Sequence, residues 1–184
     1  MKRLTLALVV IFGAFGLNAG AQTCEVLCKE EFWKRASQAE ISAEMSKTDV
    51  NAREATSETV LMYVAVYGTS KNVQVLLDAG ADVNARAENG MTALFFAAGF
   101  GTAENLKVLL DAGAEMNAVD ENGITALMFA AMIGTAEKVK VLLDAGADSS
   151  MKDSMGWTAW NYLQFNDALK DTDVYSILNN ARSE

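Results

Sequence analysis

The sequence predicts an all-α solenoid of about five stacked helix–turn–helix repeats, joined by short turn-like or hairpin-like loops. Two motifs recur at a spacing of 33 residues. The motif VLLDAGADVNA, with small variations, lies at 75–85, 108–118 and 141–151. A motif that begins with threonine, TALFFAA in one copy, lies at 59–65, 92–98, 125–131 and 158–164. A fixed period of this length is typical of stacked supersecondary units, so residues 22–184 are interpreted as one repeat domain.

The first 21 residues have the pattern of a segment that is removed after export. They begin with two basic side chains, continue as an uncharged apolar run, and end in Ala19-Gly20-Ala21, an A-x-A cleavage pattern. The apolar run is shorter than the roughly 20 residues that a membrane span needs. We therefore predict a cleaved signal peptide over 1–21 rather than a membrane anchor. The mature chain is expected to be periplasmic or secreted, without membrane contact after cleavage.

Two cysteines lie close together at the start of the expected mature chain. Cys24 and Cys28 are four residues apart in an apparent helix. Helical positions i and i+4 have Cα atoms about 6 Å apart, within the range that a disulfide accepts. Because an exported chain meets an oxidising compartment, we expect a structural disulfide that holds the first turn. A redox-active pair is the alternative, but such pairs usually have a C-x-x-C spacing.

Each repeat has recognisable helix boundaries. Thr92 is the expected N-cap of a first helix, which follows an Asn-Gly turn. A Gly-Thr pair ends this helix and begins a second one. The second helix is expected to end at a glycine such as Gly80 or Gly113, because glycine readily adopts the left-handed backbone of this position. We expect Leu110 and Leu143 of the second helices to be buried between stacked units.

The terminal repeats have the features of caps. Residues 29–35 mix charged side chains with Phe32 and Trp33, as an amphipathic capping helix does. Ser37 and Glu40 form a capping box at the start of the next helix. The predicted repeats are 22–55 as the N-terminal cap, then 56–88, 89–121 and 122–154, and 155–184 as the C-terminal cap.

This pattern resembles the ankyrin repeat, which has a period of 33 residues and the motif T-P-L-H-x-A-A in its first helix. The resemblance covers residues 48–165 strongly. The proline of the motif is replaced by Val60, Ala93, Ala126 and Ala159. Its histidine is replaced by Met62, Phe95, Met128 and Asn161, which predicts a more apolar junction between repeats and a changed network of loop hydrogen bonds. The resemblance implies a protein–protein interaction module without catalysis.

The composition argues against an enzyme. No histidine occurs in the 184 residues, which removes the usual general base and the imidazole metal ligand. Acidic side chains outnumber basic ones by 24 to 15, and the net charge of −9 argues against a nucleic-acid partner. Recurring acids such as Asp111 and Asp144 are expected to be solvated, since no D-x-D-x-D-G calcium loop is present. We expect no cofactor and no metal, and a metal-binding or enzymatic protein is the less favoured alternative.

The expected binding surface is the concave groove of the stack together with the tips of its turns. Positions that follow a turn are expected to face solvent, and they hold Glu58, Met91, Ile124 and Trp157. The first helices end with a second apolar ladder beside this one, made of Tyr67, Phe100 and Ile133. Large apolar residues in exposed positions are typical of a contact site, with Trp157 and Phe100 as the strongest anchors.

An acidic rim is expected beside this apolar surface. Its predicted members are Glu88, Asp120, Glu121 and Asp153. Exposed carboxylates of this kind would favour a basic protein partner and speed its association. We expect a monomer that binds a protein in the periplasm. An exported effector that binds a host protein is the alternative role.

The export pattern generates a testable prediction. The mature protein should begin at Gln22, because cleavage follows the A-x-A pattern. Its intact mass should be two units below the reduced value if Cys24 and Cys28 are bridged, which mass spectrometry measures directly. Two freely alkylated thiols in exported material would contradict the bridge.

Overall fold

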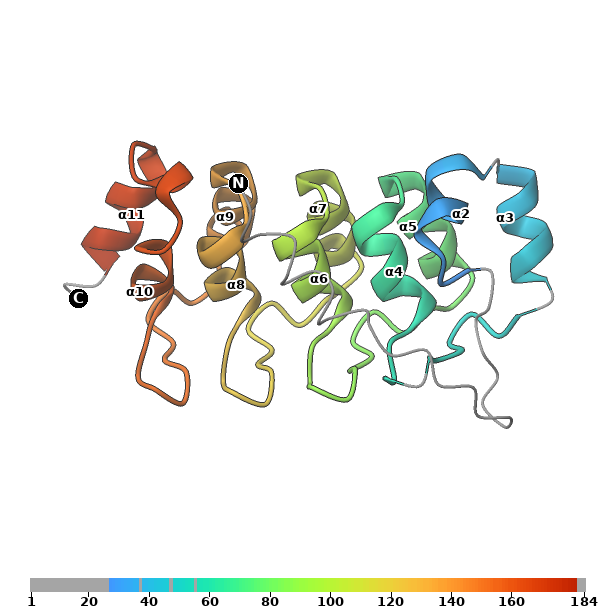
Figure 1. Ribbon diagram of the computed structural model, residues 1–184, viewed down its shortest axis with the longest axis horizontal. Coiled ribbons are helices and arrows are strands. Elements are labelled where there is room, and N and C mark those ends of the chain that lie inside the picture. Colours follow the sequence, from blue (N-terminus) through green and yellow to red (C-terminus); the bar gives the residue numbers. More distant parts are fainter. Residues whose placement is uncertain (1–26, 37, 47, 55, 182–184) are drawn as a thin grey trace.

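The protein forms a row of stacked helix pairs, as the computed structural model shows (Figure 1). The structure describes residues 27–181, except residues 37, 47 and 55. The helices are α2 (Glu30–Arg35), α3 (Gln38–Met45), α4 (Val60–Tyr67), α5 (Ser70–Asp78), α6 (Ala93–Phe100), α7 (Ala103–Asp111), α8 (Ala126–Ile133), α9 (Ala136–Asp144), α10 (Ala159–Leu163) and α11 (Asp173–Ala181), with a 3-10 turn η1 (Asp167–Leu169) before α11. Isolated β-bridges join parts of the loops, but the described residues contain no strand. The predicted all-α solenoid is confirmed.

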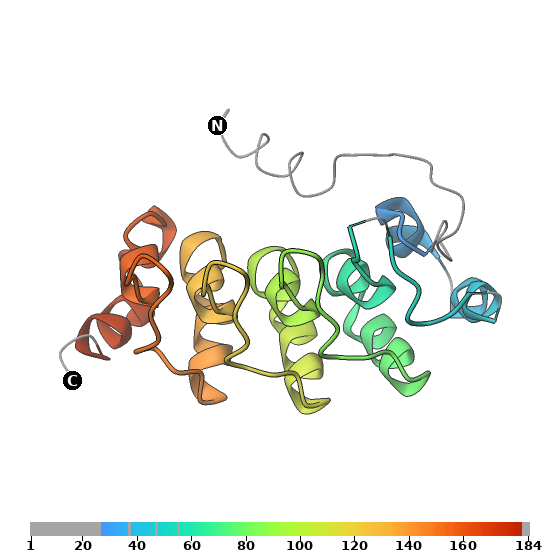
Figure 2. The ribbon, with the colours of Figure 1, turned by 90° about the horizontal axis from the view of Figure 1, so that it is seen from below.

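The helices form two layers (Figure 2). The inner helices α4, α6, α8 and α10 pack side by side, and the outer helices α5, α7 and α9 pack behind them. Helix α11 closes the row against α9 and α10, and α2 packs against α4. The loops before the inner helices project to one side of the row (Figure 1). We call these loops fingers, and they comprise residues 49–59, 82–92, 115–125 and 148–158.

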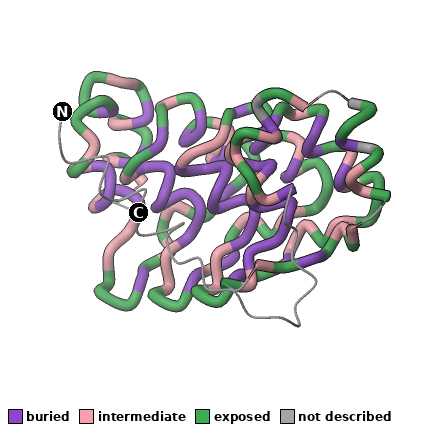
Figure 3. Tube along the Cα trace, turned by 45° about the vertical axis from the view of Figure 1, so that its right-hand side comes forward, coloured by how far each residue is buried: buried purple, intermediate pink, exposed green. Residues whose placement is uncertain are grey.

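The core runs through the middle of the stack (Figure 3). In α6 every residue from Ala93 to Gly99 is buried, and in α8 every residue from Ala126 to Ala131. Ala97 and Ala98 are small, so neighbouring helices can approach closely at their positions. Each helix pair buries its apolar surface against the next pair, because one pair alone has too little core to be stable.

The outer helices bury only one leucine of each Leu-Leu pair. Leu109 and Leu142 are 0% exposed, whereas Leu110 and Leu143 are half-buried. The prediction that Leu110 and Leu143 are the buried leucines is therefore wrong. Consecutive residues of a helix are about 100° apart, so the buried stripe that runs from Leu106 to Leu109 leaves Leu110 at the side. There it borders a shallow cleft between α7 and α9.

The helix boundaries at the Gly-Thr pairs and at the second-helix glycines are confirmed. Thr102 caps α7 and accepts the backbone N–H of Asn105 at 3.1 Å. Thr92 is the N-cap residue of α6, although its hydroxyl makes no capping hydrogen bond. Gly113, after the end of α7, has φ +86°, and Gly80 after α5 has φ +90°. These left-handed conformations are the reason that glycine ends the outer helices.

Side chains of the outer helices bind the C-terminal end of the inner helix that belongs to the preceding repeat. Asn105 Nδ2 donates to the carbonyls of Ala65 and Gly68, at 3.0 and 3.1 Å. One repeat later, Lys138 Nζ donates to the carbonyl of Gly99 at 2.8 Å. Burial lowers the pKa of Lys138. Both side chains satisfy carbonyls that a helix end would otherwise leave without an intrahelical partner.

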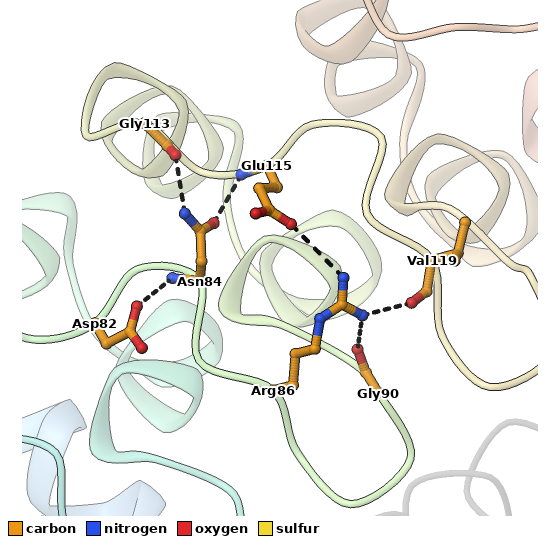
Figure 4. A network of polar contacts seen from close by, with 7 residues as sticks. All are labelled: Asp82, Asn84, Arg86, Gly90, Gly113, Glu115 and Val119. Carbon is orange, nitrogen blue, oxygen red and sulfur yellow. Dashed lines mark hydrogen bonds and ion pairs between the residues drawn. The ribbon is translucent and has the colours of Figure 1, made fainter.

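Asparagine side chains join consecutive fingers (Figure 4). Asn84 Nδ2 donates to the carbonyl of Gly113 at 3.2 Å, and Asn84 Oδ1 accepts the N–H of Glu115 at 2.8 Å. Asn51 makes the same two contacts with the corresponding backbone groups one repeat earlier. Each asparagine uses both a donor and an acceptor on the next repeat, so it fixes the position of one finger relative to the next.

Two arginines add a second connection between the fingers. Arg86 Nη1 donates to the carbonyls of Gly90 and Val119, at 3.2 and 2.7 Å (Figure 4). Its Nη2 lies 3.6 Å from a carboxylate oxygen of Glu115. Arg53 makes equivalent contacts one repeat earlier. The equivalent position in the next finger is Val119, so this arginine ladder ends there.

The junction at the start of the inner helices keeps hydrogen bonds despite the missing histidine. Met62 and Met128 accept the N–H of the threonine that caps their own helix, with N···S distances of 3.4 and 3.5 Å. In α10, Asn161 Oδ1 accepts the equivalent N–H at 2.9 Å. A sulfur atom thus accepts the capping N–H in the two repeats that have methionine, and an amide oxygen accepts it in the repeat that has asparagine.

Some predictions concern parts of the chain outside the described residues. The signal peptide over 1–21, Cys24 and Ser37 are among them. The cleavage site, the Cys24–Cys28 disulfide and the Ser37 capping box therefore stay predictions.

The burial pattern of the outer helices predicts unequal effects of two neighbouring substitutions. Leu109→Ala should lower the free energy of unfolding by about 2–5 kcal/mol, because it removes a fully buried side chain and leaves a cavity. Leu110→Ala is the matched control, since the same change on a half-buried side chain should cost only about 1–2 kcal/mol. Denaturant unfolding followed by circular dichroism measures both values. Equal losses would contradict the assigned buried stripe.

The backbone conformation of Gly113, after the end of α7, predicts that a larger residue there lowers stability without any steric clash. A Cβ on Gly113 would meet no atom within 4 Å, so the effect of Gly113→Val comes from its φ of +86° alone. A β-branched residue in this conformation should lower the free energy of unfolding by about 1–3 kcal/mol. Gly113→Asn should cost less, because asparagine tolerates the left-handed region better. Thermal unfolding of the two variants tests this order, and a valine variant as stable as the asparagine variant would refute it.

Candidate protein-binding surface

The predicted contact residues occupy both ends of the inner helices. The half-buried residues just before the threonine caps are Met91, Ile124 and Trp157. The last residues of α4, α6 and α8 are Tyr67, Phe100 and Ile133. An inner helix of 8 residues is about 12 Å long, so the two ladders lie at opposite helix ends rather than side by side as predicted. We call the surface shared by the inner helices and the fingers the inner face.

The most exposed apolar side chains of the inner face are in its last two repeats. Ile133, a predicted contact residue, is 42% exposed. Met155 and Phe165, which the sequence analysis missed, are 63% and 64% exposed. Met155 occupies the turn position that holds asparagine in the two preceding fingers. This break in the repeat pattern is the signal that could have identified it.

We call Trp157, together with the exposed Met155 and Phe165, the C-terminal platform. The rings of Trp157 and Phe165 are stacked, with centroids 5.6 Å apart and an interplanar angle of 14°. Tyr162 packs edge-on against Trp157 from behind, with centroids also 5.6 Å apart. Helix α10 has only 5 residues, so Phe165 lies close enough to Trp157 for this stack.

A buried carboxylate supports the platform. Asp153 Oδ1 accepts the backbone N–H groups of Met155 and Trp157, both at 2.8 Å. Its Oδ2 accepts the hydroxyl of Tyr162. Burial acts to raise the pKa of Asp153, but these hydrogen bonds outweigh it and hold the pKa below its usual value. Burial and the bond to Asp153 raise the pKa of Tyr162. Asp153 therefore fixes the backbone and the supporting ring of the platform.

The predicted acidic rim is smaller than expected. Asp153 is 8% exposed and Asp120 is 7% exposed, because each carboxylate folds back onto the backbone of its own finger. Asp120 Oδ1 accepts the N–H groups of Asn122 and Ile124, both at 2.8 Å. Only Glu88 and Glu121 of the four predicted rim residues are exposed. The prediction was wrong for the two aspartates because turn-forming side chains bind their own loop.

The middle of the inner face is tied to the core by aromatic contacts. Phe100 packs edge-on against Phe129 of the next inner helix, with centroids 5.7 Å apart. Phe129 is 6% exposed and also contacts Phe95. Phe100 is therefore half-buried, and it joins two repeats as well as lining the surface.

The N-terminal end of the inner face is polar. Glu58, expected to face solvent, is only 4% exposed, and its carboxylate accepts the hydroxyls of Thr56 and Tyr63 at 3.1 Å each. Burial raises the pKa of Glu58, and the charge of Glu54 adds to this rise. Burial first, and then the nearby carboxylates, raise the pKa of Tyr67. The inner face thus has a buried carboxylate and half-buried phenol groups at its N-terminal end, and exposed apolar groups at its C-terminal end.

The chemistry of this surface suits recognition. Within residues 27–181 as described, no group of three or more His, Cys, Asp or Glu side chains could hold a metal ion. In the same part of the chain, no helix has the length and apolar character needed to span a membrane. The inner face offers instead an apolar surface with aromatic residues, a composition typical of the centres of protein interfaces.

Comparison with known proteins agrees with this arrangement. A family model described as ankyrin repeats, in three copies, matches residues 27–120 and 106–170. No curated protein matches the chain. Ankyrin repeats are generally protein–protein interaction modules and are typically non-catalytic. Since the model covers more than half of the sequence and the matched residues form the observed helix pairs, the chain belongs to the ankyrin repeat family.

Proposed function

We propose that the chain is an exported, non-catalytic module that binds a protein partner through its inner face and finger tips. The observation that carries this proposal is the exposure of large apolar side chains. Among the described residues four such side chains are well exposed, and three of them lie on the inner face: Ile133, Met155 and Phe165. Large apolar groups exposed on one face of a protein typically mark a contact site.

The proposed site of action rests on the pattern of the first residues of the chain. The basic start, apolar run and A-x-A pattern of residues 1–21 support export to the periplasm or beyond it. The mature chain would then act as a monomer that holds its partner outside the cytoplasm. Recovery in osmotic-shock fluid would support the periplasm. Recovery only in the culture medium would favour an exported effector that acts on a host protein.

The experiment that tests the proposal is photo-crosslinking from defined positions. A benzophenone amino acid at position 165 should give a discrete adduct with a partner protein in the exporting cell. Position 177 on α11 is the matched control, because Ile177 is also well exposed, at 42%, but lies outside the inner face. The same adduct from position 177 alone would contradict binding at the inner face.

A substitution provides an independent measurement of the same site. Phe165→Ala should weaken binding of the crosslinked partner by about 10- to 30-fold, because anchoring aromatic residues carry much of an interface's energy. Its melting temperature should stay close to that of the parent, since the Phe165 side chain is 64% exposed. Unchanged affinity, measured by calorimetry with the purified partner, would remove Phe165 from the site.

A further inference from the structure

The finger tips form one continuous row. The N–H of Glu121 donates to the carbonyl of Asn89 in the preceding finger, at 3.1 Å. The N–H of Ser154 donates to the carbonyl of Asn122 at 2.8 Å. These bonds place Glu88, Glu121 and Ser154 at equivalent positions of three consecutive fingers, and Met155 follows Ser154 directly in the chain. The exposed Glu88 and Glu121 therefore belong to one row of finger positions that ends at Ser154, beside Met155 of the C-terminal platform.

Basic side chains of the described fingers do not neutralise this row. Arg53 and Arg86 donate to finger carbonyls, and Arg86 pairs with Glu115. Lys152 lies on another side of its finger, where it lines a cleft with residues of α11. Within the described residues, no ion pair involves Glu88 or Glu121. The row therefore presents negative charge beside an apolar surface.

The negative charge of this surface favours a basic partner over a second copy of the chain. A second copy of the chain would bring another net negative charge against this surface, which opposes self-association. A basic segment of another protein complements both the carboxylates and the net charge. Its apolar anchor would be a large side chain, since the platform offers the stacked rings of Trp157 and Phe165.

The spacing of the repeats constrains the conformation of that segment. Packed helices are about 8–10 Å apart, so neighbouring fingers recur at a step of about 8–10 Å. A polyproline II backbone returns to the same face every third residue, after about 9 Å. Side chains three residues apart in such a segment would therefore meet consecutive fingers.

We propose that the C-terminal platform and the acidic finger row together bind an extended basic segment of a partner protein. One large apolar side chain of this segment rests on Trp157 and Phe165. A lysine or arginine three residues away lies beside Glu121, and another, six residues away, lies beside Glu88. This proposal rests on the proposed function. It adds the chemistry of the partner's segment and the three-residue spacing of the side chains that bind.

A peptide selection tests the proposal without a known partner. The probe is a displayed library of random peptides of about 12 residues, selected on the immobilised full chain; this length covers the platform and both carboxylates. We expect enriched peptides to carry one large apolar residue followed or preceded by basic residues at intervals of three. For a synthetic copy of such a peptide, affinity should fall at least about 10-fold between about 50 and about 500 mM salt.

Variants of the chain complete the test. Phe165→Ala should weaken the peptide at least about 10-fold, and Glu88→Gln with Glu121→Gln should weaken it about 3- to 10-fold and reduce its salt dependence. Ile177→Ala is the control and should have no effect. Enriched peptides that are not basic, or the absence of any enrichment, would overturn the proposed chemistry. Neither result would count against a folded protein partner on the inner face. Peptides that bind the Phe165→Ala variant at full affinity would overturn this proposal and count against the proposed function too.

Discussion

A Cβ atom on Gly101 would lie 2.1 Å from the carbonyl oxygen of Ala65 in the preceding inner helix, so only glycine allows the two helix ends to approach so closely. Asn105 then donates to the carbonyls of this junction, and Lys138 does so at the next one. The inner helices therefore stack at a fixed distance. Each finger leads directly into an inner helix, so the contact at the helix ends also determines where the finger tips and the inner face lie.

The local architecture could be predicted from the sequence because it depends on residues that act within their own repeat. A threonine that caps a helix or a glycine such as Gly113 has the same effect in each copy, and the structure places the helix ends where these residues predict. The stacking itself follows from the period of the motifs. The period does not determine which of Leu109 and Leu110 is buried, because that depends on how the helix is rotated against its neighbours.

The surface was harder to predict, for two physical reasons. Asp120 and Asp153 look like exposed acids, but their carboxylates bind the backbone of their own turns and become buried. Phe165 is the equivalent of Met132, which is half-buried against the core; in the described chain no further inner helix follows α10, and Phe165 is exposed. Exposure at the end of a stack depends on the missing neighbour, and a repeat pattern carries no information about that neighbour.

The support of Trp157 by Asp153 and Tyr162 has a consequence for the thermodynamics of recognition. The backbone on both sides of the turn and the ring behind Trp157 are already held by hydrogen bonds and edge contact. Conformational entropy at these positions is therefore lost when the chain folds, and little remains to be lost when a partner arrives. Association with such a preorganised surface avoids a free-energy cost of about 0.5–1.5 kcal/mol for each side chain that would otherwise have to be immobilised. A small contact area can then support a specific complex.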